Sequence, residues 1–247
     1  MIFRIDGYEM TNTIITLDIE TIPTQSPEII HALLSDAEVE KSALTAPSNY
    51  KDAEKIAAHI KARSAEIDAS FDERYRKTAL DGTYGQIVVA AIAIEDQEPF
   101  AFWSADWRDS EHIVIGNLFS TIENCYAANP SRLPVFVGHN VLDFDFRFLF
   151  QRAAILGIRP PPCIPFDSPA WSDRVFDTMT RWSGRWKYIS LDNLCRAFGI
   201  PEKGELDGSK VWDAVKYGRI TDVVEYCKDD VRRTREIYKR ITFQEAL

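Results

Sequence analysis

The chain has 247 residues, of which 45% are hydrophobic and 27% charged, and its formal net charge is −9. That length supports one large domain with its own core, so we expect a single domain over residues 1–247. An acidic chain is a poor non-specific binder of duplex nucleic acid, and no apolar run is long enough to span a bilayer. The four cysteines are scattered and form no CxxC pair, which argues against a zinc site and for a reduced, cytoplasmic setting.

The first predicted strand, TIITLDIET at residues 13–21, is rich in isoleucine and threonine, as buried strands are. Because side chains alternate between the two faces of a strand, Asp18 and Glu20 point the same way. Two such carboxylates repel each other, and a hard divalent cation such as Mg²⁺ or Mn²⁺ would relieve the repulsion. Taken alone, the pair is equally typical of a solvated strand end.

Residues 24–77 are polar and helix-prone, with apolar residues at helical spacing between residues 52 and 67. We therefore expect two or more helices inserted after the first strand. The simplest interpretation is a surface elaboration without a catalytic function, although such an insertion could also act as a lid or bind a protein partner.

The rest of the chain alternates between apolar strands and longer amphipathic segments. Residues 86–94 are almost wholly apolar, which is typical of a central strand buried on both faces. Further strands are predicted at 99–103, 134–138 and 174–177. Helices are predicted at 111–128, from near residue 143, at 190–199, around 211–215 and at 221–241.

Two further groups of polar residues stand at the ends or on the faces of these elements. A short loop carrying Asn140 joins the strand that ends at Gly138 to an aromatic-rich helix. Asp143 suits the N-cap of that helix, whereas Asp145 is harder to explain as a cap because large apolar residues follow it. On the last helix, a tyrosine and an aspartate four residues apart share one face.

Three motifs thus follow one another in separate predicted elements: Asp18-x-Glu20, Asn140-x-x-x-Phe144-Asp145 and Tyr226-x-x-x-Asp230. Their order resembles the DEDD superfamily of 3′–5′ exonucleases, in its tyrosine-bearing branch (DEDDy). In detail the chain resembles the predicted exonucleases related to the proofreading domain of family B DNA polymerases, through residues 191–204, 207–212 and 225–230. The likeness covers most of the chain except residues 24–77.

This resemblance implies a ribonuclease H-like α/β fold, with a mixed five-stranded sheet flanked by helices and a helical insertion after the first strand. It also implies a two-cation site for Mg²⁺ or Mn²⁺ that hydrolyses phosphodiesters and releases nucleoside 5′-monophosphates from a 3′ end. Tyr226 would orient the attacking water. The implied metal ligands are Asp18, Glu20, Asp145 and Asp230.

The expected partner is a single-stranded 3′ end, with DNA favoured over RNA. An exoribonuclease and an inactive nucleic-acid-binding relative remain alternatives, as do Asp143, Asp177 and Asp229 as additional site residues. The resemblance implies substrate contacts by Ile19, Thr21, Asn140, Phe144 and Lys203. Aromatic side chains that could hold a base are Trp103, Trp182, Trp186 and Tyr188, although tryptophans of the basic and aromatic stretch 181–188 could equally pack on the sheet.

Overall fold

The computed structural model describes residues 4–5, 8–9, 12–184, 187–201, 204 and 206–244. The chain forms two compact units, one built from residues 1–21 and 87–247 and the other from residues 22–86. Arg4–Ile5 (β1) and Tyr8–Glu9 (β2) form a short antiparallel pair ahead of the main sheet.

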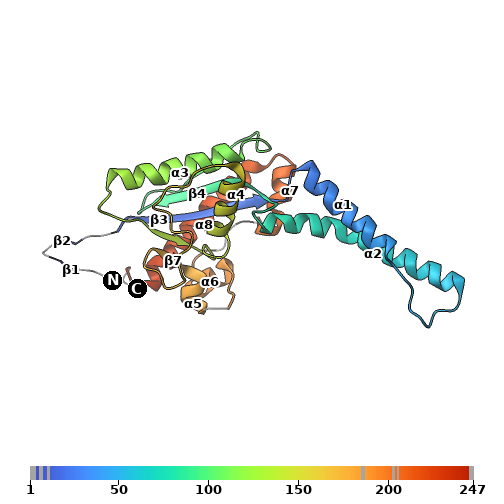
Figure 1. The fold of residues 1–247 in the computed structure, drawn as a ribbon. Coiled ribbons are helices and arrows are strands. Elements are labelled where there is room, and N and C mark those ends of the chain that lie inside the picture. Colours follow the sequence, from blue (N-terminus) through green and yellow to red (C-terminus); the bar gives the residue numbers. More distant parts are fainter. Residues whose placement is uncertain are drawn as a thin grey trace. The chain divides into compact units, whose positions relative to one another are not determined.

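The larger unit is built on a five-stranded sheet with the strand order β5-β4-β3-β6-β7. Figure 1 labels β3, β4 and β7 of this sheet. Strand β5 pairs antiparallel with β4, whereas β6 pairs parallel with both β3 and β7, so the sheet is mixed as predicted. The strands are β3 (Ile14–Ile22), β4 (Gln86–Ile94), β5 (Phe100–Trp103), β6 (Val135–Gly138) and β7 (Val175–Asp177).

Because side chains alternate along β3, one face of this strand carries apolar residues and the other carries the two carboxylates. Ile15, Leu17 and Ile19 enter the main hydrophobic core, which α3 (Glu111–Ala128) and α4 (Asp145–Leu156) complete. Asp18 and Glu20 therefore point to the opposite face, where α8 (Ile220–Ile241) contacts the sheet. The carboxylates face a helix that is amphipathic and carries its own polar residues.

The remaining described helices of this unit are α5 (Thr178–Ser183), α6 (Leu191–Phe198), α7 (Val211–Lys216) and the short 3₁₀ turn Gly208–Lys210. Ser190 caps α6 by accepting a hydrogen bond from the Asn193 N–H, and Gly199 ends it in the left-handed conformation. Two local predictions were wrong. Helix α5 was missed, and α4 begins at Asp145 without a capping side chain, so Asp143 is not its N-cap.

A buried ion pair fastens the core helices to the sheet. Arg152 of α4 donates two hydrogen bonds to Glu111 of α3, at 2.8 and 2.7 Å. Glu111 also accepts the Ile87 N–H of β4 at 2.8 Å. These hydrogen bonds from α4 and β4 compensate the cost of burying the charged Glu111 carboxylate.

The smaller unit contains the two helices predicted after the first strand, α1 (Pro27–Ser42) and α2 (Ala53–Lys77), which lie side by side (Figure 1). Arg74 pairs with Glu40 at 2.7 Å across the two helices. The Thr24 N–H donates to Thr78 Oγ1 at 2.9 Å, which closes the base of the hairpin. None of the described helices is both long and apolar enough to cross a membrane.

Candidate active site

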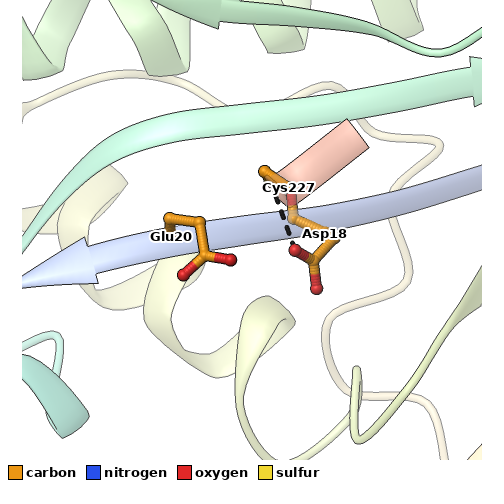
Figure 2. Close-up of side chains that lie close together, drawn as sticks. All are labelled: Asp18, Glu20 and Cys227. Carbon is orange, nitrogen blue, oxygen red and sulfur yellow. Dashed lines mark hydrogen bonds between the residues drawn. The ribbon is translucent and has the colours of Figure 1, made fainter. Parts of the chain in front are cut away.

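Asp18 and Glu20 lie two residues apart on the face of β3 that α8 covers. One carboxylate oxygen of each residue and the Cys227 sulfur lie within 4.8 Å of one another. Figure 2 shows the two carboxylates on β3 with Cys227 of α8 beside Asp18. The predicted shared face of the pair is therefore observed.

Cys227 is a neighbour of the site that sequence reasoning missed. It is fully buried, and its thiol lies 3.3 Å from Asp18 Oδ2 and 3.4 Å from the Asp18 carbonyl oxygen, as a donor to both. Burial, followed by the charges of Asp18 and Glu20, raises the pKa of the Cys227 thiol well above its usual value. The thiol is therefore protonated at neutral pH and acts as a hydrogen-bond donor. The signal in the sequence that could have identified Cys227 is its position directly after Tyr226.

Asp145 lies at the first position of α4 and is only 3% exposed. Its Oδ1 accepts the Ile19 N–H at 3.1 Å. Thr16 pairs with Val137, and β6 ends one residue later, so β3 extends beyond its partner strand. Beyond the end of β6, the Asp145 carboxylate accepts the hydrogen bond of a β3 backbone N–H. This hydrogen bond places the Asp145 carboxylate beside the strand that carries Asp18 and Glu20.

The loop between β6 and α4 is held by Asp177. A side chain at Gly138 would place its Cβ 2.5 Å from Val141 Cβ, so only glycine fits this turn. Asn140 adopts a left-handed φ of 62°, and its N–H donates to Asp177 Oδ1 at 3.1 Å. The Leu142 N–H donates to Asp177 Oδ2 at 3.3 Å. Asp177 also caps α5, so the contacts of this carboxylate are structural.

The late-helix motif brings two more groups to the same place. Asp230 is 7% exposed and Tyr226 is half-buried, one turn apart on α8. Burial, then the charges of Glu20, Asp230 and Asp18, raises the pKa of the Tyr226 hydroxyl well above its usual value. Tyr226 therefore remains protonated and can orient a water molecule, but it is a poor base.

The carboxylates raise one another's pKa. Burial, then the charges of Glu20, Asp145 and Asp230, raises the pKa of Asp18 well above its usual range, against the hydrogen bond from Cys227. Burial also raises the pKa of Asp145 to about 7; hydrogen bonds from its own backbone and from Ile19 oppose the rise, while Asp177 and Asp230 add to it. The first, second and third motifs thus lie within electrostatic reach of each other.

The rival aspartates lie outside this cluster. Asp143 is exposed, and Asp229 forms an ion pair with Arg232. Among the predicted substrate contacts, Ile19 has its side chain in the core, whereas Thr21, Asn140 and Phe144 are partly exposed. Lys203 and Trp186 lie outside the described residues.

A pocket of about 550 Å³ opens beside Tyr226, a size in the usual range for ligand sites. Basic side chains of Lys210 and Arg219 stand on its wall, together with acidic ones. Its lining residues are Gly204, Leu206, Lys210, Arg219, Asp222, Glu225, Tyr226 and Asp229.

The donor set of the cluster fits hard divalent cations. Carboxylate oxygens are the preferred ligands of Mg²⁺ and Mn²⁺. The pKa values of Asp18 and Asp145 are raised first by burial and then by neighbouring carboxylates, so part of each shift comes from repulsion between negative charges. Cations bound by these oxygens would remove that repulsion.

The chain belongs to the family of predicted 3′-5′ exonucleases related to the exonuclease domain of PolB, which matches residues 78–246. The family predicted from the motifs is therefore confirmed. Asp145, Tyr226 and Asp230 lie inside the matched region. Asp18 and Glu20 lie before it, and here they stand in electrostatic contact with the matched residues.

The structure resembles the family B DNA polymerase from the hyperthermophilic archaeon Pyrobaculum calidifontis, with a TM-score of 0.56 and 18% sequence identity. The likeness covers 96% of this chain and 25% of that one, so the chain spans about a quarter of the polymerase. It confirms the ribonuclease H-like α/β fold. No curated protein matches the sequence.

Proposed function

We propose that this protein is a divalent-cation-dependent 3′–5′ exonuclease that releases nucleoside 5′-monophosphates from single-stranded DNA ends. The observation that supports the proposal is that four carboxylates and Tyr226 lie within electrostatic reach of one another around β3, in a chain of an exonuclease family. The proposal includes the domain organisation: the chain forms one exonuclease domain, and residues 24–77 are an insertion that could bind a protein partner.

The metal ligands would be Asp18, Glu20, Asp145 and Asp230. Two bound Mg²⁺ or Mn²⁺ ions would supply charge compensation at the phosphate and a lower pKa for the attacking water. Water attacks the terminal phosphorus, the bond to the 3′ oxygen of the preceding nucleotide breaks, and a nucleoside 5′-monophosphate leaves. The protonated Tyr226 hydroxyl would fix the orientation of that water.

The incoming strand needs a route to these residues. The pocket beside Tyr226 is the proposed entry for the terminal nucleotide. Exposed Trp182 and Tyr188 are proposed to stack on the bases that follow. The His139 Nε2–H donates to the Ile189 carbonyl at 2.9 Å, which ties the Tyr188 segment to the loop before Asp145.

Digestion of end-labelled oligonucleotides tests the proposal. DNA and RNA strands labelled at the 5′ or the 3′ end are incubated with Mg²⁺, Mn²⁺ or EDTA. We expect 5′-labelled DNA to shorten stepwise, 3′-labelled DNA to lose its label at once as a mononucleotide, and EDTA to stop both. Preferential cleavage of RNA would identify an exoribonuclease. Binding without cleavage in any condition would contradict catalysis and identify an inactive relative.

A further inference from the structure

Arg233 lies on α8 three residues after Asp230, on the same face of the helix. Arg233 is only 6% exposed. Its Nη1 donates to Asp230 Oδ1 at 3.2 Å, and its Nη2 donates to Asp192 Oδ1 of α6 at 2.7 Å. One guanidinium thus joins a predicted metal ligand to a second helix.

This arrangement is costly if it serves packing alone. The Arg233 Nε is buried and has no hydrogen-bond acceptor among the described residues. Asp192 is half-exposed, so water weakens its attraction for the buried cation. An apolar side chain of similar length would fill the same space without the desolvation cost of a charge. Packing alone therefore does not explain a charged side chain here, and its contact with Asp230 indicates an effect on the carboxylate cluster.

We propose that Arg233 is a positioning residue that fixes the Asp230 carboxylate and sets, through its permanent charge, how tightly the site binds divalent cations. Asp192 offsets part of that charge. This inference rests on the cation site of the proposed function.

Opposite effects on cation affinity follow from the charges. In Arg233→Met the guanidinium no longer repels a bound cation, so the cation should bind more tightly, by about 3- to 30-fold for a charge removed within several ångströms. In Asp192→Asn the charge of Arg233 is no longer offset, so the cation should bind more weakly, by roughly 2- to 5-fold at this exposed position.

The shape of the guanidinium has a separate effect. Arg233→Lys keeps the positive charge but loses the planar fork that engages both carboxylates at once. Its cation affinity should stay within about threefold of the parent, because the charge is retained. Turnover at saturating Mn²⁺ should fall in both Arg233→Met and Arg233→Lys, since Asp230 is no longer held.

The experiment is calorimetric titration of the metal-free full chain with Mn²⁺, for the parent and the three variants. Arg232→Met is the matched control: it removes the same charge one residue earlier, where the side chain pairs with Glu98 and Asp229. Thermal melts and circular dichroism verify folding, and hydrolysis of a 5′-labelled oligonucleotide is measured separately. We expect tighter binding in Arg233→Met, weaker binding in Asp192→Asn and little change in Arg232→Met.

The inference is overturned if folded Arg233→Met binds Mn²⁺ no more tightly than the parent, or if Arg232→Met matches it. Should Arg233→Met fail to fold, unchanged affinity in Asp192→Asn, or Arg233→Lys with full turnover, contradicts it equally. If the parent binds Mn²⁺ but does not hydrolyse nucleic acid, the proposed function is overturned. The Mn²⁺ affinities of the variants then still test the inference about Arg233. A parent that binds no Mn²⁺ overturns both.

Discussion

At the scale of residues, burial separates the proposed metal ligand Asp145 from the neighbouring Asp143. Asp143 and Asp145 are two positions apart, yet only Asp145 is buried and bonded to the strand that carries Asp18. The resemblance to the exonucleases favoured Asp145, but Asp143 remained an alternative because both carboxylates stand at the start of the same helix. Packing around the end of β3 distinguishes them, and such packing cannot be read from a local pattern.

Tyr226→Phe should lower turnover by roughly 10- to 1000-fold, in the range of a positioned catalytic contact, with little change in Mn²⁺ affinity. The hydroxyl is expected to touch water rather than the cation, and the ring keeps its packing. Oligonucleotide hydrolysis and Mn²⁺ calorimetry give the two numbers, with exposed Tyr217→Phe as control. Loss of Mn²⁺ binding in Tyr226→Phe would show that the hydroxyl does not act on the nucleophile.

Cys227→Ala should weaken Mn²⁺ binding by about 2- to 10-fold, because Asp18 loses a buried hydrogen-bond donor that fixes its orientation. Cys227→Ser keeps a donor at the same atom and should stay close to the parent. Calorimetry on both variants separates the donor from the volume of the side chain. Equal affinities in the alanine and serine variants would argue that the thiol only fills space.

At the scale of elements, hydrophobic patterning predicted the five strands and the long helices, because each has a strong period or a long apolar run. It failed at α5, six residues long, whose start depends on a cap that Asp177 supplies from the end of β7. It also could not reveal that Asp177 binds the loop at Asn140, or that Arg233 and Cys227 border the carboxylates. Such contacts join residues far apart in sequence, and no local periodicity encodes them.

Asp177→Ala should lower the free energy of unfolding by roughly 2–4 kcal/mol, because buried and partly buried N–H groups of the 140–142 loop and of α5 lose their acceptor. Urea denaturation measures the change. Asp207→Ala removes a half-exposed aspartate cap from a short 3₁₀ turn and should cost about 1 kcal/mol or less. If both variants lose the same stability, other contacts hold the second motif.

At the scale of the whole molecule, the carboxylate cluster destabilises the metal-free folded protein. A pKa of about 7 for Asp145 lies above its ordinary value, so the folded protein favours the protonated form. The stability contributed by that proton is present at low pH and is lost as pH rises through 7. Divalent cations, which bind only the native cluster, should restore stability at high pH.

Asp145→Asn isolates this effect, since asparagine carries no charge and can still accept the Ile19 N–H. Relative to the metal-free parent, the variant should gain about 1 kcal/mol more at pH 8 than at pH 6. Thermal or urea unfolding in EDTA at both pH values measures the difference. Added Mn²⁺ should reverse it by stabilising the parent more than the variant. A gain that does not change with pH would contradict the burial of a charged carboxylate at this position.

The most direct test of the central claim compares neighbouring aspartates in one measurement: the Mn²⁺-dependent shortening of 5′-labelled single-stranded DNA. Asp145→Asn and Asp230→Asn remove proposed metal ligands, whereas Asp143→Asn makes the same chemical change at an exposed position outside the cluster. We predict that hydrolysis is abolished in the first two variants and retained within about threefold in Asp143→Asn, because a solvent-exposed charge is screened and contributes little to the site. Full activity in folded Asp145→Asn or Asp230→Asn would contradict the assignment of this cluster as the active site.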